Sequence, residues 1–284
     1  MLTHFYDLLC SAAALIPLEC MQMRFMQEAF IGILLLAPLT AAAGIQVVNF
    51  RMAFFSDAIG HSVFAGVAIG LLLSVSPAVS MPVTALIVGG GIMLMKRCSR
   101  LSSDTVIGVF YSAVAAAGLA LISRNPNVAR DMQTFLYGDI LTISGGEIAY
   151  LFILSLAFYI FQLFAFNKLM IIGLDEKLAK AHRIKGALYE YIYVGLLALI
   201  VITAVKAAGV LLVTALLIVP SAAARNLASS AGMMFFLALA TGLFSGITGL
   251  LLSAQESINA SSGAMIVLVA SAVFLVTLFR QKKG

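Results

Sequence analysis

The amino-acid sequence predicts an all-α, polytopic transmembrane helical bundle of about eight or nine spans. Of its 284 residues, 62% are hydrophobic and only 10% are charged, whereas about 25% are charged in an ordinary soluble domain. The mean hydropathy is +1.10. Apolar runs such as 31–39 and 210–219 are continuous, unlike the alternating strands of a membrane β-barrel. These observations exclude a soluble globular enzyme, a disordered chain and a secreted disulfide-rich domain.

Nine segments are apolar and long enough to approach the 20 or so residues that a spanning helix needs. The predicted spans are 27–48, 58–76, 78–96, 104–124, 147–166, 188–205, 208–224, 232–253 and 263–280. Residues 1–26 are ambiguous, and form either an interfacial helix or an additional span. The segment 208–224 is short and ends at Pro220, so a broken or re-entrant helix is the alternative to a full crossing. We find no linker or repeat, which predicts one transmembrane domain over residues 1–284.

Lysine and arginine residues set the predicted orientation. When the connection 96–103 is placed in the cytoplasm, thirteen of the 17 basic residues fall on that side, as the positive-inside rule expects. The net charge of +5 therefore indicates cytoplasmic loops of a cytoplasmic-membrane protein and not nucleic-acid binding. Two long connections remain, an outer one at 125–146 and a Lys-rich inner one at 167–187. The sequence contains no GxxxxGK phosphate-binding loop.

The stretch RMAFFSDAIGHSVFAGVAIG (51–70) carries the strongest candidate site. Asp57 and His61 are four residues apart, so a helix places them on one face. Together they suit a divalent ion such as Zn²⁺, Mn²⁺ or Fe²⁺, and ionisable residues inside a membrane usually serve a function. The structural alternatives are an N-cap for Asp57 and a backbone hydrogen bond for His61.

Small residues at four-residue steps predict close helix packing. One ridge is Ala58, Ser62, Gly66 and Gly70, adjacent to the Asp57 and His61 face. A second ridge is Ala238, Gly242 and Gly246. Pore lining is the alternative interpretation of these residues.

The chain resembles the membrane permease subunits of bacterial ABC importers for zinc, manganese and iron, over roughly residues 25–280. Four blocks in the family's order carry the resemblance: 51–70, FLYGDIL (135–141), GVLLVTALLIVPSAAARN (209–226) and SSGAMIVL (261–268). The resemblance implies that Asp57 and His61 lie on the translocation path and contact the metal. Asp139 matches the family's Gly-Asp pair, although an outer-loop cap or turn is the alternative role.

Two departures from the family's pattern concern the last block. Family members often have Pro-Ser-Gly where this chain has Ser261, Ser262 and Gly263. They often have an acidic residue two positions earlier, where this chain has Asn259. Glu256 is the nearby carboxylate that would substitute for the missing charge.

The resemblance also implies the assembly. Two copies of the permease would form the pathway in the lipid bilayer, two separate ATPase subunits would dock on the inner face, and an extracytoplasmic solute-binding protein would deliver the metal. The permease itself would be no enzyme and would hold no cofactor of its own, because ATP is used by the partner. The segment 220–232, with Pro220, Arg225 and Asn226, would couple to the ATPase. The loop 173–186 is a second cytoplasmic candidate, with a solvated loop as its alternative.

Three other classes stay open from the residues alone. A secondary transporter would use Asp57 as a proton or ion relay and need no ATPase. An ABC permease for a metal chelate, such as a siderophore or cobalamin, would need a wide cavity. An intramembrane enzyme would use Asp57 and His61 as acid and base. The choice among zinc, manganese and iron also stays open, because Asp and His suit all three.

Overall fold

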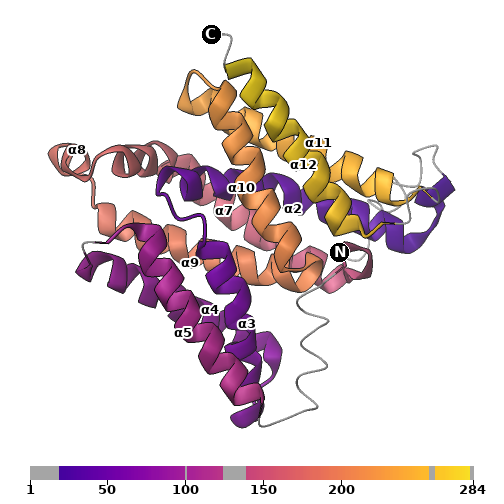
Figure 1. The fold of residues 1–284 in the computed structure, drawn as a ribbon, viewed down its shortest axis with the longest axis horizontal. Coiled ribbons are helices and arrows are strands. Elements are labelled where there is room, and N and C mark those ends of the chain that lie inside the picture. The colour runs from indigo at the N-terminus through magenta and orange to yellow at the C-terminus, as the bar shows by residue number, and fades with distance from the viewer. Residues whose placement is uncertain (1–18, 100, 124–138, 256–259, 282–284) are drawn as a thin grey trace. The chain divides into compact units, whose positions relative to one another are not determined.

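The computed structural model describes residues 19–99, 101–123, 139–255 and 260–281 (Figure 1). Within these ranges every regular element is a helix. The chain divides into two compact units. Unit 1 comprises residues 1–45, 137–156 and 206–284, and unit 2 comprises residues 46–136 and 157–205.

Eight helices of the described residues are long and apolar enough to cross a membrane, which confirms the all-α, multi-span prediction. They are α2 (Arg24–Asn49), α4 (Pro77–Cys98), α5 (Ser103–Ile122), α7 (Gly145–Leu174), α9 (Gly186–Ala208), α10 (Val210–Leu227), α11 (Ala231–Ser253) and α12 (Ser262–Gln281). The remaining predicted span, 58–76, overlaps α3 (Phe55–Leu72), a helix of 18 residues. Short helices η1 (Glu19–Gln22), η2 (Ile140–Thr142) and α8 (Glu176–Ala181) complete the described elements.

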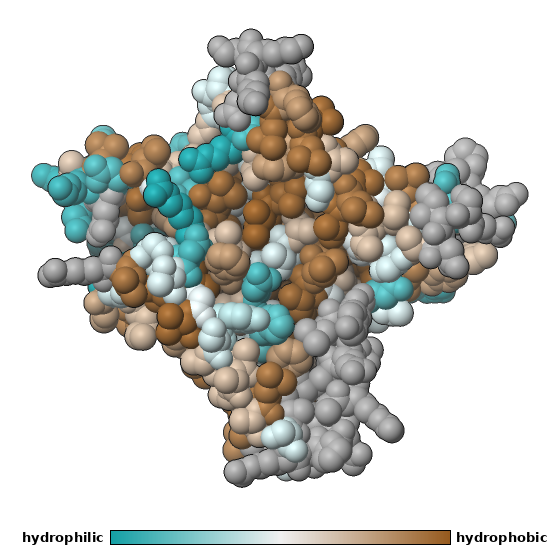
Figure 2. Space-filling model, in the orientation of Figure 1, coloured by the Kyte–Doolittle hydropathy of each residue, from teal (hydrophilic) through white to brown (hydrophobic). Residues whose placement is uncertain are grey.

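Large apolar side chains are exposed along several of these helices. Leu163 is 82% exposed, Phe164 73% and Phe236 72%, and apolar residues cover much of the face drawn in Figure 2. In water such surface would be unfavourable by about 25 cal/mol per Å². In a bilayer it contacts acyl chains, while each helix satisfies its own backbone polar groups.

In unit 1 the helices α10, α11 and α12 pack against one another, and small residues bring α2 close to two of them. The ridge residues Gly242 and Gly246 of α11 face Ala37 of α2, where an added Cβ would meet its atoms at 3.1 Å. Gly44 of α2 faces the backbone of α10 at Leu217. The ridge on α11 is therefore a packing surface, as its spacing predicts.

In unit 2, α3 packs against both α4 and α5. The ridge residues Ala58 and Ser62 are fully buried. Gly66 lies against Met81 of α4, and Gly70 lies against Ser80. Gly118 of α5 in turn faces the α3 backbone at Ala65, where its Cβ would lie 3.0 Å from the nitrogen. Close packing is thus the role of this ridge as well.

Two segments have a structure that the local sequence patterns left undecided. Pro220 lies inside the continuous helix α10 and does not end it. At this position the Thr241 hydroxyl of α11 donates to the Pro220 carbonyl at 3.3 Å. The inner connection 167–187 is also largely helical, since α7 continues to Leu174 and α8 follows. The question of residues 1–26 falls mostly outside the described residues.

Candidate metal-binding site and coupling segment

A tight turn positions the start of α3. Arg51 has a φ of 53°, the Met52 amide donates to the Val47 carbonyl at 3.0 Å, and the Phe55 amide donates to the Met52 carbonyl at 3.1 Å. Because the helix begins at Phe55, Asp57 lies in its first turn and not at the N-cap. A carboxylate there interacts favourably with the partial positive charge of the helix N-terminus.

His61 lies one turn further along the same helix and is partly exposed. Its ring meets Tyr111 of α5 edge to face, with 5.1 Å between the ring centroids and an interplanar angle of 72°. The Phe64 ring lies 5.5 Å away on the other side. The Asp57 carboxylate is close enough to interact electrostatically with the imidazole. Two aromatic rings therefore restrict the histidine beside a carboxylate one turn away.

Tyr111 is a neighbour of His61 that the sequence did not reveal. It is a polar aromatic residue in a span that is otherwise rich in alanine, valine and glycine. No spacing rule connects two residues fifty positions apart on different helices. Only the packing of α3 against α5 brings them together.

The other candidate ligands lie elsewhere or are not described. Asp139, in unit 1, caps η2 by accepting from the Leu141 amide at 3.1 Å, and it also accepts from the Ser262 hydroxyl at 2.8 Å. Glu256 and Asn259 fall outside the described residues. Within the described ranges, no group of three or more His, Cys, Asp or Glu side chains gathers. Asp57 and His61 thus offer two side-chain ligands from one helix.

The predicted coupling segment spans the end of α10 and the start of α11. Arg225 is exposed in the last turn of α10, whereas the Asn226 amide donates to the Thr277 hydroxyl of α12 at 3.1 Å. Ala228 to Ser230 then form a three-residue link, and the Ser230 hydroxyl accepts from the Met233 amide to cap α11. Asn226 therefore ties the helix end to its unit, and Arg225 is presented to the surroundings.

The second cytoplasmic candidate, 173–186, contains α8. Asp175 caps this short helix by accepting from the Lys177 amide at 2.7 Å. His182 ends it, and Arg183 follows in the left-handed region with a φ of 56°. The segment is a compact helical turn in place of the loop that its composition suggests.

Eight described helices that are long and apolar enough to cross a membrane define a polytopic membrane protein. Residues 22–281 match the family described as the ABC 3 transport family. The chain belongs to that family and is a multi-pass permease of the bacterial cytoplasmic membrane.

Similar proteins cover nearly the whole chain. The high-affinity zinc uptake system membrane protein ZnuB of Haemophilus influenzae is 29% identical over 88% of this chain and 95% of its own length. The manganese transport system membrane protein MntC of Listeria monocytogenes is 29% identical over 93% of this chain and 94% of its own length. The solved structure of PsaBC from Streptococcus pneumoniae in complex with Fab matches with a TM-score of 0.75 and 29% identity, over 98% of this chain and 95% of that one.

Proposed function

We propose that this chain is the permease subunit of an ATP-driven importer of a divalent transition-metal ion. The observation that carries the proposal is the Asp57 and His61 pair on α3, held beside Tyr111. The relatives named for zinc and manganese transport support the substrate class. Zinc, manganese and iron are the candidate ions, because one carboxylate and one imidazole suit each of them.

In this proposal Asp57 and His61 form a transient stopping point for the ion. A transport site must bind strongly enough to accept an ion and weakly enough to release it. Two side-chain ligands meet that requirement better than a closed tetrahedral set, which holds zinc permanently. The contact with Tyr111 would orient the imidazole, and the remaining coordination positions would stay with water.

The permease would work as a pair of identical copies with two cytoplasmic ATPase subunits and an extracytoplasmic binding protein. ATP would be hydrolysed by the ATPase subunits, and the permease would supply the path. The segment 220–232 would transmit the conformational change, with exposed Arg225 contacting the ATPase. Because Asn226 is bonded to Thr277 of α12, movement of the segment would be passed directly to that helix.

The experiment measures total cellular metal by mass spectrometry in a strain that lacks this permease and is grown in metal-limited medium. Wild-type protein should restore one of the three metals, and His61→Ala should not restore it. Tyr150→Ala is the control, because this aromatic residue is 45% exposed on α7 and lies outside the candidate site and both candidate coupling segments. If His61→Ala restores the metal as fully as Tyr150→Ala does, the proposed path is wrong.

A second measurement separates this proposal from a secondary transporter. Radioactive metal uptake is followed in vesicles that contain the permease with either an active or a hydrolysis-deficient ATPase partner. Uptake should require the active ATPase and persist when an uncoupler collapses the proton gradient. Uptake that continues with the hydrolysis-deficient ATPase and stops when the uncoupler is added would favour a secondary transporter with Asp57 as a proton relay. Uptake of the metal only as a chelate would favour a permease for metal chelates.

A further inference from the structure

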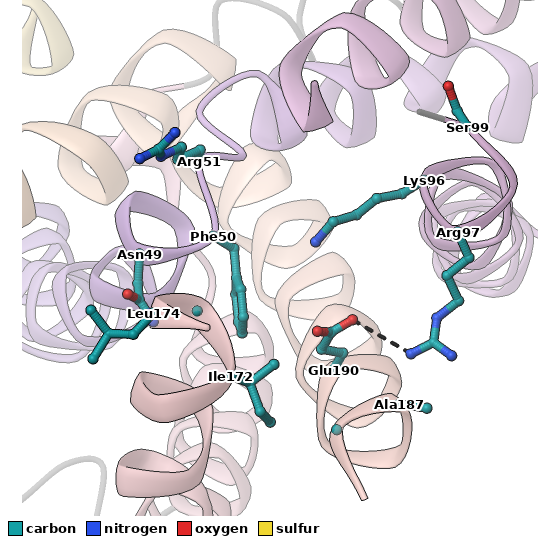
Figure 3. Close-up of a pocket in the computed structure, with 12 residues that line it drawn as sticks. Asn49, Phe50, Arg51, Lys96, Arg97, Ser99, Ile172, Leu174, Ala187 and Glu190 are labelled. Carbon is teal, nitrogen blue, oxygen red and sulfur yellow. Dashed lines mark ion pairs between the residues drawn. The ribbon is translucent and has the colours of Figure 1, made fainter. Parts of the chain in front are cut away.

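A pocket of about 780 Å³ opens in unit 2 at the ends of four candidate spans. It lies among the last residues of α2, α4 and α7 and the first residues of α9. Figure 3 shows the side chains that line it. The Lys and Arg distribution assigns this end of the four helices to the cytoplasm. The pocket is separate from Asp57 and His61, neither of which lines it.

Positive charge predominates among the lining side chains. Arg51, Lys96 and Arg97 line the pocket together with a single acidic residue, Glu190. Arg97 pairs with Glu190, with 3.6 Å between the guanidinium nitrogen and the carboxylate oxygen. Among the described residues, neither Arg51 nor Lys96 forms an ion pair, so the pocket carries an excess of positive charge.

The Lys96 side chain points into the pocket (Figure 3). Its side chain extends toward Phe50 and Glu190 (Figure 3), with the nitrogen 5.3 Å from the centre of the Phe50 ring and 3.9 Å from the Met52 sulfur. Phe50 and Met52 carry no negative charge, and Glu190 is paired with Arg97. An anion that enters the pocket would therefore meet a pre-positioned cation.

One wall of the pocket is apolar and open to the surroundings. Leu174, the last residue of α7, lines the pocket and is 73% exposed, and Ile172, two residues earlier, lines it as a buried side chain. α7 is a candidate span of 30 residues, and Leu174 ends it on the side that the Lys and Arg distribution assigns to the cytoplasm. The pocket thus combines cations with an exposed apolar residue at the cytoplasmic end of a candidate membrane helix.

We propose that this pocket binds the phosphodiester group of an anionic membrane phospholipid. Lys96 and Arg51 would contact the phosphate oxygens, and Leu174 would contact the upper part of an acyl chain. Basic pockets at the cytoplasmic ends of membrane helices bind anionic headgroups in this way. A free phosphate ion would use the same cations and would gain nothing from the apolar wall, which is why the lipid is the favoured source.

The test uses a single tryptophan as reporter, because the sequence contains none. Leu174→Trp in the full chain places an indole on the exposed wall of the pocket. The protein is reconstituted in bilayers of phosphatidylcholine that contain increasing fractions of phosphatidylglycerol with brominated acyl chains, and quenching of the fluorescence reports occupancy. Brominated phosphatidylcholine provides the reference for non-selective contact.

Phosphatidylglycerol should bind several-fold more tightly than phosphatidylcholine, and Lys96→Met should reduce that preference about fivefold, as expected for loss of one basic residue near a membrane surface. Arg51→Asn should reduce it similarly, because Asn tolerates the left-handed backbone at this position. Lys96→Arg, which keeps the charge, should retain the preference. Lys177→Met is the matched control, because Lys177 is an exposed lysine of α8 that does not line the pocket.

Three results would overturn the proposal. One is equal affinity of the Leu174→Trp protein for the two lipids. Another is an equal loss of preference in Lys177→Met and Lys96→Met, which would reflect surface charge alone. The third is displacement of the brominated lipid by millimolar inorganic phosphate, which would identify a site for a free anion. Each variant must give the same size-exclusion profile as the wild type. If Lys96→Met fails to fold, the lipid preference of Arg51→Asn tests the proposal in its place.

Discussion

Replacement of Gly44 by alanine tests how closely α2 and α10 must approach within unit 1. The added Cβ would overlap the backbone carbonyl oxygen of Leu217 and lie 2.5 Å from the Ser221 hydroxyl oxygen. Ordinary contact for a Cβ begins at 3.4 Å. The two helices would have to separate by about 0.9 Å at the Ser221 contact, and by more at Leu217.

The energetic consequence follows from the contacts that such a separation would break. The Ser221 hydroxyl donates to the Ala41 carbonyl of α2 at 2.9 Å, and a 0.9 Å shift would take that distance beyond hydrogen-bonding range. Loss of the bond costs about 1 kcal/mol, and overpacking costs about 1–3 kcal/mol. The better helix propensity of alanine stabilises the fold by roughly 0.5–1 kcal/mol relative to glycine. The net loss for Gly44→Ala is therefore about 2 kcal/mol.

The assay is thermal unfolding of the purified protein in detergent, followed by the fraction that stays monodisperse. A loss of about 2 kcal/mol corresponds to a fall in Tm of roughly 4–8 °C for a chain of this size. Gly90→Ala is the matched control, since nothing lies within 4 Å of its added Cβ, and its Tm should stay the same or rise slightly. A Gly44→Ala protein as stable as Gly90→Ala would refute the close approach of α2 and α10.

Three further predictions concern the candidate site and its surroundings. Tyr111→Phe should keep metal uptake, because the aromatic ring that contacts His61 is retained. Tyr111→Ala should reduce uptake several-fold, and initial rates of radioactive metal uptake distinguish the two variants. Asp139→Asn should leave both metal uptake and the Tm unchanged, because the amide oxygen can still accept the hydrogen bond from the Ser262 hydroxyl. A loss of uptake at unchanged Tm would instead show that the carboxylate takes part in metal handling. Arg225→Glu should weaken co-purification of the ATPase partner without lowering the Tm, since Arg225 is exposed; undiminished co-purification would remove it from the coupling surface.

The sequence was sufficient for the spans and for the two packing ridges. A spanning helix is encoded locally, because every backbone polar group in lipid must be satisfied within the segment itself. The ridges are also local, since residues four apart share a face. For these reasons the nine predicted spans each correspond to a helix, and Gly66 and Gly242 lie at close helix contacts.

Pro220 shows where a local rule is insufficient. Proline removes a backbone donor and permits a break, so the sequence alone left a broken helix open as the alternative to a full crossing. In the continuous helix α10 the Ser221 hydroxyl donates to the Leu217 carbonyl, and the Thr241 hydroxyl of the next helix donates to the Pro220 carbonyl. Whether a distant hydroxyl reaches a carbonyl depends on helix packing, which no pattern around Pro220 encodes.

The sequence by itself determined the class of protein, the positions of the membrane helices and the pairing of Asp57 with His61 along one helix face. Only the tertiary structure decided what surrounds that pair and which helix ends meet. Tyr111 contacts His61 because α5 packs on α3, and Lys96, Arg51 and Glu190 line one pocket because the ends of α2, α4 and α7 meet the start of α9 there. The physical reason is that helix formation and side-chain periodicity are short-range properties, whereas contacts between helices depend on the packing of residues far apart in the chain.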